Sequence, residues 1–375
     1  MENPPADGSS QLVYFDPFLV DRARISLGLA AKELAAQALR KKKRGDVQPI
    51  DYRTIQRIYR REGLFPETAK IIADVLGQSV VDLLAPWDKL YRPPALPAGP
   101  LMGEAEWESE GYVDQGRLAS NGLYYIICRM RHRHTQGKLA RGKYYHLGWL
   151  SETLRESLRH MLSRHADVCA RIGVHPRIAV NFTSAPAPAR DGWWVIDHWN
   201  GGRTLADYLR DGCWPREKLP RLLLQIAEGL DALHRAQVVF RELAPARVLI
   251  SDQDGSAVLT DFELAKLLDG SPSVSTEWAK EHPDRSFRAP EVDGGEATTK
   301  SDLYSFARLA LAALGETSED YAGAAKRLST AEMPKKLGRL LLDHLEPVPD
   351  RRPGDLDSLL KELNRWATKE FYGTV

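Results

Sequence analysis

The sequence predicts a multidomain α+β protein in which a small all-α module precedes a larger mixed region. Residues 12–91 carry apolar side chains at helical spacing, separated by residues that start and stop helices. The proline-rich segment 92–102 predicts an extended linker, because proline fixes φ and removes a backbone donor. After the linker, a long helical pattern at 222–234 and a strand pattern at 258–262 indicate mixed structure. The polar residues 1–11 predict a disordered tail.

The composition is that of an ordinary globular chain. Of 375 residues, 43% are hydrophobic and 27% are charged, and the net charge is only +1. No apolar run reaches the roughly 18 residues of a membrane span, and the N-terminus lacks the apolar core of a signal peptide. Three scattered cysteines favour a reducing compartment over a disulfide framework or a cysteine zinc site. We therefore expect a cytoplasmic protein with no membrane contact and no metal site.

The first module contains two well-marked helices and a basic cluster. Asp51 is a suitable N-cap for a helix over 52–62, which Gly63 ends, and Pro66 opens a second helix that stops at Gly77. Nine basic and two acidic residues lie between Arg40 and Arg61, in a chain that is otherwise nearly neutral. A run of this kind is usually a solvated face, so the charge alone does not identify a partner.

The pattern around this cluster resembles the lambda-repressor-like helix-turn-helix family of the xenobiotic-response-element type. The matching residues are Thr54–Ile55–Gln56–Arg57–Ile58 and Pro66–Glu67–Thr68, although the segment before Thr54 is longer than the family's tight turn. The resemblance implies that the helix beginning at Tyr52 enters the major groove of double-stranded DNA. It implies base contacts from one set of residues and phosphate contacts from another. The first set is Arg53, Thr54, Gln56 and Arg57, and the second is Arg60, Arg61, Arg40, Lys41, Lys42, Lys43 and Arg44.

Three motifs in the second half of the chain resemble eukaryotic-type protein kinases. The segment 240–249, Phe-Arg-Glu-Leu-Ala-Pro-Ala-Arg-Val-Leu, is similar to the catalytic loop H-R-D-L-x-x-x-N. Asp261–Phe262–Glu263 resembles D-F-G, and Ala289–Pro290–Glu291 matches A-P-E. The resemblance implies a bilobal fold, with an N-lobe over 103–198 and a C-lobe over 199–375. It also implies that Asp302 anchors the catalytic loop and that Arg352 pairs with Glu291.

Several chemical positions depart from the kinase pattern. The metal-binding Asp261 remains, but Arg247 stands where the second metal ligand should be asparagine, Glu242 replaces the catalytic-base aspartate, and Glu263 replaces the D-F-G glycine. Residues 116–122 do not fit a glycine-rich loop. The strand expected to carry the ATP-binding lysine aligns with 144–150, which has none, and Lys143 at its start is a poor match. Glu152 and Glu156 on the next helix then lack a lysine partner. We therefore predict a pseudokinase without catalytic residues or a cofactor, with bound ATP and Mg²⁺ as the alternative.

Together these patterns predict a prokaryotic transcription regulator that binds double-stranded DNA. Its pseudokinase domain would be an interaction or assembly platform for another protein, and a homo-oligomer is expected because such helix-turn-helix proteins bind two half-sites. One alternative is an atypical active serine/threonine kinase that uses Asp261 and Glu242. Another is a protein–protein adaptor whose helical module does not bind DNA.

Overall fold

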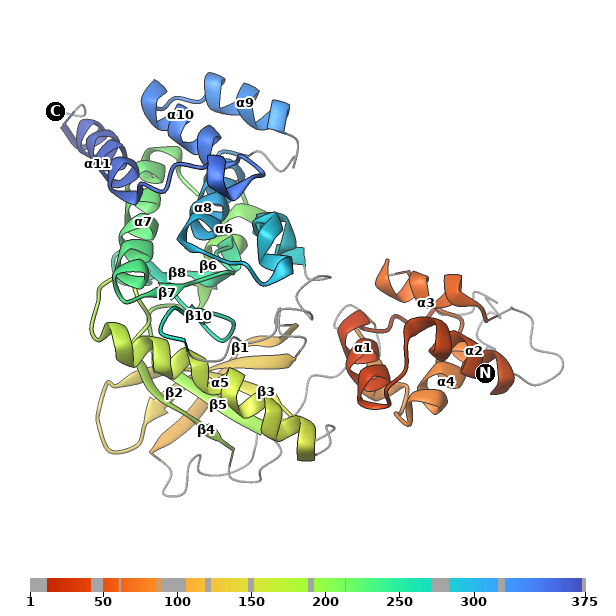
Figure 1. Cartoon of the computed structure of the whole chain (residues 1–375). Helices are drawn as coiled ribbons and strands as arrows, with labels where there is room; N and C mark the ends of the chain where they lie inside the picture. The colour runs from red at the N-terminus through yellow and green to blue at the C-terminus, as the bar shows by residue number, and fades with distance from the viewer. Residues whose placement is uncertain are drawn as a thin grey trace, which may run out of the picture. The chain divides into compact units, whose positions relative to one another are not determined.

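The chain forms two compact units, Met1–Ala95 with Gln115–Tyr125, and Leu96–Asp114 with Ile126–Val375. The computed structural model in Figure 1 describes most of both units. The described residues are 12–41, 50–60, 62–85, 88, 106–118, 123–147, 152–187, 192–212, 214–270, 283–315 and 321–372. The predicted tail (1–11) and linker (92–102) lie outside these ranges.

The first unit is a small helical bundle. Its elements are α1 (Pro17–Ser26), α2 (Ala31–Lys41), α3 (Tyr52–Tyr59), α4 (Pro66–Leu76) and the short 3₁₀ helix η1 (Val81–Leu83). Helix α2 packs against α3 and α4. Phe15, Leu34, Ile55, Ile58 and Ile72 are buried between the helices. The helical spacing of apolar side chains therefore produces a common core, as expected.

The ends of these helices follow from local chemistry. The Asp51 carboxylate accepts the Thr54 N–H at 3.1 Å, while Thr54 Oγ1 accepts the Asp51 N–H at 3.2 Å, which makes a reciprocal capping box. Helix α3 ends at Tyr59, earlier than predicted, because the Glu62 N–H donates to the Arg57 carbonyl and closes the last turn. Gly77 ends α4 at a φ of 65°, a conformation that favours glycine.

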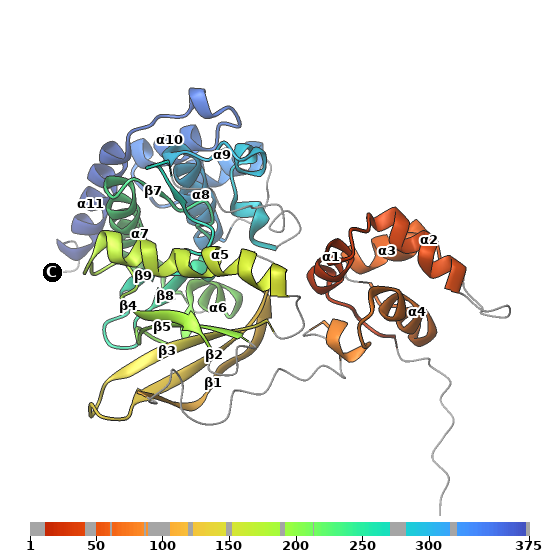
Figure 2. The ribbon, with the colours of Figure 1, turned by 60° about the horizontal axis from the view of Figure 1, so that its bottom comes forward.

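The second unit begins with a five-stranded sheet in the order β1-β2-β3-β5-β4. The strands are β1 (Trp107–Leu118), β2 (Tyr124–His132), β3 (Leu139–His146), β4 (Asn181–Pro186) and β5 (Gly192–His198). Strands β3 and β5 are antiparallel, with Arg141 opposite Asp197 and Lys143 opposite Val195. The long helix α5 (Glu152–Ile172) packs on β4 and β5, as Figure 2 shows.

Both faces of strand β3 are buried, and each face has a different character. Ala140 and Tyr144 join an apolar core with Met130, Trp194 and Ile196. Successive side chains of a strand point to opposite faces, so the intervening residues of β3 face the other way. Those residues are Arg141, Lys143 and Tyr145, and all three are buried.

The rest of the unit is mainly helical. Its helices are α6 (Leu205–Arg210), α7 (Leu219–Arg235), α8 (Thr299–Ala313), α9 (Tyr321–Thr330), α10 (Lys335–His344) and α11 (Leu356–Tyr372). The short strands are β6 (Arg203–Thr204), β7 (Val238–Val239), β8 (Val248–Ile250), β9 (Ala257–Leu259) and β10 (Lys266–Leu267). The 3₁₀ helices are η2 (Arg216–Lys218), η3 (Pro245–Arg247), η5 (Pro283–Phe287), η6 (Pro290–Gly294) and η7 (Pro349–Arg351).

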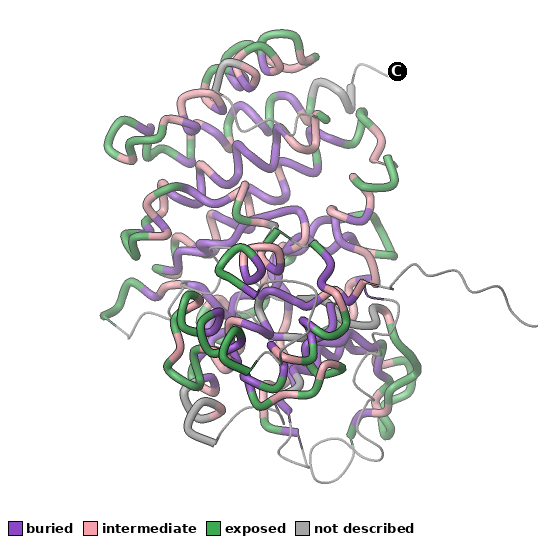
Figure 3. The backbone as a smooth tube through the Cα atoms, turned by 90° about the vertical axis from the view of Figure 1, so that its right-hand side faces the viewer, coloured by how far each residue is buried: buried purple, intermediate pink, exposed green. Residues whose placement is uncertain are grey.

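Helix α7 lies at the centre of this helical part. It packs against α8 and α11, and its Leu223, Ile226 and Leu230 are buried with Phe306 and Leu359 in one apolar cluster. Figure 3 shows the buried positions running through the middle of these helices. The sheet followed by helices agrees with the predicted kinase-like α+β fold, and α7 contains the whole helical pattern predicted at 222–234. Among the described residues, no helix is long and apolar enough to cross a membrane.

Candidate active site

Lys143 lies near the middle of β3 rather than at its start. The alignment that placed the lysine-bearing strand at 144–150 was therefore wrong, because β3 ends at His146. The Lys143 ammonium is buried, and it contacts Asp261 Oδ1 at 3.1 Å and Glu263 Oε1 at 2.9 Å. The Tyr145 hydroxyl donates to the same Glu263 oxygen at 2.6 Å. The chain thus has a buried lysine at the sheet, and its carboxylate partners come from the 261–263 motif.

Asp261 is surrounded by positive charge. Besides Lys143, Arg141 Nη1 lies 3.4 Å from Asp261 Oδ1, and Arg247 Nη1 lies 3.8 Å from Asp261 Oδ2. Burial alone would raise the pKa of Asp261, but Lys143, Arg141 and Arg247 together hold that pKa well below its usual range. Glu263 also has a lowered pKa, since the nearby Lys143 charge outweighs its burial. Both carboxylates are therefore ionised and neutralised by side chains of this chain.

The backbone at Asp261 adopts an uncommon conformation. Its φ is 65°, a region that non-glycine residues enter rarely and mostly where the surrounding structure enforces it. Arg241 in the catalytic loop has a similar φ of 69°. Such outliers cluster at functional sites, which agrees with the motif assignment.

Glu242, at the catalytic-base position, is also paired. Arg288 Nη2 donates to Glu242 Oε1 at 2.7 Å, and both side chains are buried. Arg288 precedes the Ala289–Pro290–Glu291 motif and lies 3.5 Å from Asp293 Oδ1. A charge-assisted hydrogen bond from Arg288 thus occupies one oxygen of the carboxylate at the catalytic-base position.

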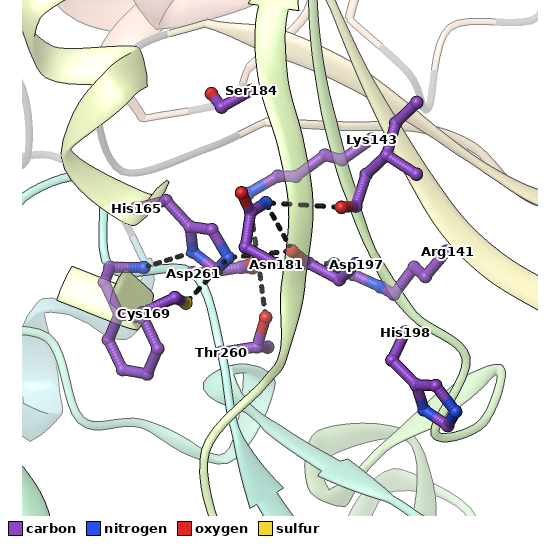
Figure 4. Close-up of polar contacts among 12 residues, drawn as sticks. Arg141, Lys143, His165, Cys169, Asn181, Ser184, Asp197, His198, Thr260 and Asp261 are labelled. Carbon is purple, nitrogen blue, oxygen red and sulfur yellow. Dashed lines mark hydrogen bonds and ion pairs between the residues drawn. The ribbon is translucent and has the colours of Figure 1, made fainter. Parts of the chain in front are cut away.

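Helix α5 is joined to the 261–263 motif by a histidine that sequence reasoning missed. His165 Nδ1 accepts the Phe262 N–H at 3.2 Å, and its ring stacks on the Phe262 ring with centroids 5.3 Å apart. Because Nδ1 accepts this hydrogen bond, it carries no hydrogen of its own, and the Nε2–H donates to Asp197 Oδ1 at 3.0 Å. Figure 4 shows His165, Asp197 and Asp261 together beneath the sheet. One signal was available: Asp197 is a charged residue directly after the apolar run Trp193–Ile196.

The structural positions predicted from the kinase resemblance have the expected contacts. Asp302 accepts the backbone N–H groups of Phe240 and Arg241, each at 2.8 Å, which holds the catalytic loop on α8. Arg352 donates to both oxygens of Glu291, at 2.6 and 2.9 Å. A bidentate pair of this kind fixes geometry as well as charge.

The predicted DNA-binding residues differ in how far they are exposed. Arg53 and Arg60 are exposed on α3, Gln56 is half-buried, and Arg40 and Lys41 are exposed at the end of α2. Arg57 is half-buried and donates to the Gly63 carbonyl at 2.6 Å. Thr54 is buried in the capping box, and its assignment as a DNA contact stays a prediction. Lys42, Lys43, Arg44 and Arg61 lie outside the described residues.

Glu152 and Glu156 lie on α5, but their side chains are outside what the structure describes. The same is true of most of the predicted loop at 116–122. Among the described residues, no three histidine, cysteine, aspartate or glutamate side chains gather as metal ligands.

The fold and the motif geometry define a protein of the kinase class. Residues 129–367 match the family described as the protein kinase domain, and the chain belongs to that family. The match begins after the helical module, so the helix-turn-helix assignment of 12–91 stays a prediction. Members of this family normally use ATP and Mg²⁺.

The curated relatives are serine/threonine kinases. The chain is 30% identical over 179 residues to the serine/threonine-protein kinase pkn2 of Myxococcus xanthus, covering 45% of this chain and 20% of that protein. It is 27% identical over 154 residues to a probable serine/threonine-protein kinase of Corynebacterium efficiens, covering 40% and 23%. It is 30% identical over 134 residues to PknA of Corynebacterium glutamicum, covering 35% and 28%. The chain thus spans less than a third of the length of each of these relatives.

These relatives favour one of the alternatives drawn from the sequence. They are named as kinases, which supports an active serine/threonine kinase better than the expectation of a degenerate domain. The geometry of this chain's own site does not favour an active kinase. Asp261 is already neutralised, and the guanidinium of Arg247 has no acceptor for a metal. The described side chains therefore do not fit a Mg²⁺ ion at this position.

Proposed function

We propose that this protein is a DNA-binding regulator whose kinase-family domain does not transfer phosphate. The observation that carries the second part is Arg247, which lies within ion-pair reach of Asp261 where the family has a metal ligand. Phosphoryl transfer depends on metal ions that spread the charge of the phosphates. A fixed guanidinium charge repels such ions and offers them no lone pair.

The pairing of Glu242 supports the same proposal. Its carboxylate is one methylene longer than that of aspartate, and Arg288 holds it in a buried ion pair. Misplacement of a reacting group by about 1 Å can cost roughly 100-fold in rate. The two carboxylates that the kinase reaction needs are thus both engaged with cations.

The second candidate is an active serine/threonine kinase. The named relatives favour it, and so does Lys143, which lies 3.1 Å from Asp261 in the manner of an ATP-binding lysine. In this case Asp261 would exchange its arginine partners for metal when the nucleotide enters.

Phosphate transfer separates the two candidates. The full chain would be incubated with radiolabelled ATP, Mg²⁺ or Mn²⁺, and a generic serine/threonine substrate such as casein. Asp261→Asn would remove the retained metal ligand, and Asp357→Asn, an exposed residue at the start of α11, would be the matched control. We expect the wild type to transfer no more label than Asp261→Asn. Transfer that Asp261→Asn abolishes and Asp357→Asn retains would overturn the proposal and establish the kinase.

The proposal of DNA binding is supported by the exposed face of α3. Arg53, Gln56 and Arg60 are three and four residues apart, so they share one side of the helix, and Arg53 and Arg60 are exposed. Their charge is concentrated in a chain whose net charge is only +1. Binding that rests on phosphate contacts weakens steeply with salt, because each contact releases counterions. The competing function is that of an adaptor, in which the same face contacts a protein.

Binding to duplex DNA would be measured by fluorescence anisotropy across a salt series. Arg53→Glu/Arg60→Glu reverses two exposed charges on α3, and Lys335→Glu/Arg339→Glu makes the same change on α10 as a control. We expect the α3 variant to bind at least about tenfold more weakly, with a shallower dependence on salt. Equal loss in both variants would indicate a nonspecific charge effect. Absence of binding at low salt would establish the adaptor instead.

A further inference from the structure

Five buried charged side chains join strand β3 to the catalytic loop and the 261–263 motif. They are Arg141, Lys143, Arg247, Asp261 and Glu263, and we refer to them as the clamp. We propose that the clamp holds the strand-rich and helical parts of the kinase-like domain together without a ligand, in the place where Mg²⁺ and ATP act in active kinases. This inference rests on the proposed function, since it assumes that the site does not turn over nucleotide.

Three residues of the clamp supply charges that the ligand would otherwise bring. In kinases the β3 lysine pairs with nucleotide phosphates, and here the anion on Lys143 is Glu263, at 2.9 Å. The metal-binding aspartate of a kinase faces Mg²⁺, and here the cations on Asp261 are Arg141 at 3.4 Å and Arg247 at 3.8 Å. Glu263 therefore stands in for a phosphate, and the two arginines stand in for the metal.

All five clamp residues are buried. No more than 4% of the surface of any clamp residue is exposed, and Arg141 and Lys143 fill the inner face of β3. Figure 4 shows Lys143 and Arg141 near Asp261. Arg247 is balanced further by Asp284, at 3.8 Å, so the positive charges do not depend on an outside anion.

The arrangement spans distant parts of the chain. Lys143 and Glu263 are 120 residues apart, and Arg141 and Asp261 are also 120 residues apart. A buried ion pair is a poor source of net stability, but losing one partner leaves the other charge uncompensated. Neutralising one clamp residue should therefore loosen β3 from the 261–263 motif. Removing the charges of Arg141, Arg247 and Glu263 together should instead open a site that a ligand can enter.

Ligand-free hydrogen exchange of the full chain tests the clamp directly. Glu263→Gln removes one charge with little change of shape, and Glu217→Gln, an exposed residue of η2, is the matched control. We expect amide exchange in β3 and at 261–263 to become at least about tenfold faster in Glu263→Gln, and unchanged in the control. Unchanged exchange in Glu263→Gln would overturn the clamp.

Nucleotide binding provides an independent test. We expect millimolar ATP, with or without Mg²⁺, to leave the wild-type melting temperature unchanged. The variant Arg141→Ala/Glu263→Gly/Arg247→Asn should gain a Mg²⁺-dependent rise in melting temperature with ATP. If this variant does not fold, hydrogen exchange in the single variant Glu263→Gln still tests the clamp.

The outcomes of the nucleotide test are separable from those of the phosphate assay. Wild-type protein that binds Mg²⁺ and ATP but transfers no phosphate overturns the clamp and leaves the proposed function standing. Transfer of phosphate by the wild type overturns both.

Discussion

At the residue scale, the catalytic loop departs from the kinase pattern at Arg247. Arg247 keeps the position of a metal ligand but inverts its electrostatic role, because it carries a fixed positive charge and no acceptor. Its contact with Asp261 removes the remaining free carboxylate from the site. A position that binds a cation in kinases is therefore itself a cation here. The carboxylates of Asp261 and Asp284 lie within ion-pair distance of it.

Another residue with a distinct electrostatic role is His344, near the end of α10. It is buried, and neither of its ring nitrogens has a hydrogen-bond partner, so burial lowers its pKa from 6.5 to about 4. At a pH between these two pKa values, His344 binds a proton in the unfolded chain but not in the folded chain. Stability is therefore fully present above about pH 6.5 and falls as the pH drops towards about 4.

Thermal unfolding from about pH 7 to about pH 5 measures this effect. We expect the kinase-like unit to lose about 2 kcal/mol more in the wild type than in His344→Leu, which cannot titrate. His134→Leu, at an exposed histidine, is the control. Parallel pH profiles for the wild type and His344→Leu would contradict the prediction.

At the scale of single elements, α3 depends on its first turn. Tyr52–Tyr59 is a helix of only eight residues, which is marginal without tertiary contacts, and its N-terminus is closed by the Asp51–Thr54 capping box. The exposed basic face of α3 is therefore presented by a helix whose start is set by one aspartate. In the same box, Thr54 Oγ1 accepts the Asp51 N–H.

Removing the cap should weaken the helical module. We expect Asp51→Ala to reduce its stability by about 1 kcal/mol, because the Thr54 N–H loses its acceptor. Asp51→Asn, which can still accept that hydrogen bond, should be close to the wild type. Chemical denaturation followed by far-ultraviolet circular dichroism provides the measurement, and equal stability of Asp51→Ala and the wild type would refute the role of the cap.

At the scale of the kinase-like unit, two kinds of contact hold the site in register. One is apolar: the Phe262 ring lies between His165 of α5 and Phe240 of the catalytic loop, with centroids 5.3 and 5.0 Å apart. The other is polar and anchors the loop to α8 through Asp302. Both are retained although the chemical positions have changed. The contacts that hold the family's scaffold together are therefore present in this chain.

The order and spacing of the motifs could be predicted from the sequence alone. The segments at 240–249, 261–263 and 289–291 specified the kinase-like fold, and the Arg352–Glu291 pair followed from that resemblance. The helices of the first module followed from local signals, namely a capping aspartate, a first-turn proline and a terminal glycine. Information of this kind lies within a few residues of the element it describes.

Only the tertiary structure decided which charges face one another. Lys143 was misjudged because the motif alignment placed the strand at 144–150, whereas β3 is Leu139–His146 and its register turns Lys143 towards the site. Its contact with Glu263, the link from His165 to Phe262 and the pair of Glu242 with Arg288 join residues 120, 97 and 46 positions apart. No local pattern encodes such distances. The sequence by itself determined the family and its missing ligands, and the packing of β3 and α5 on the catalytic loop determined what replaced them.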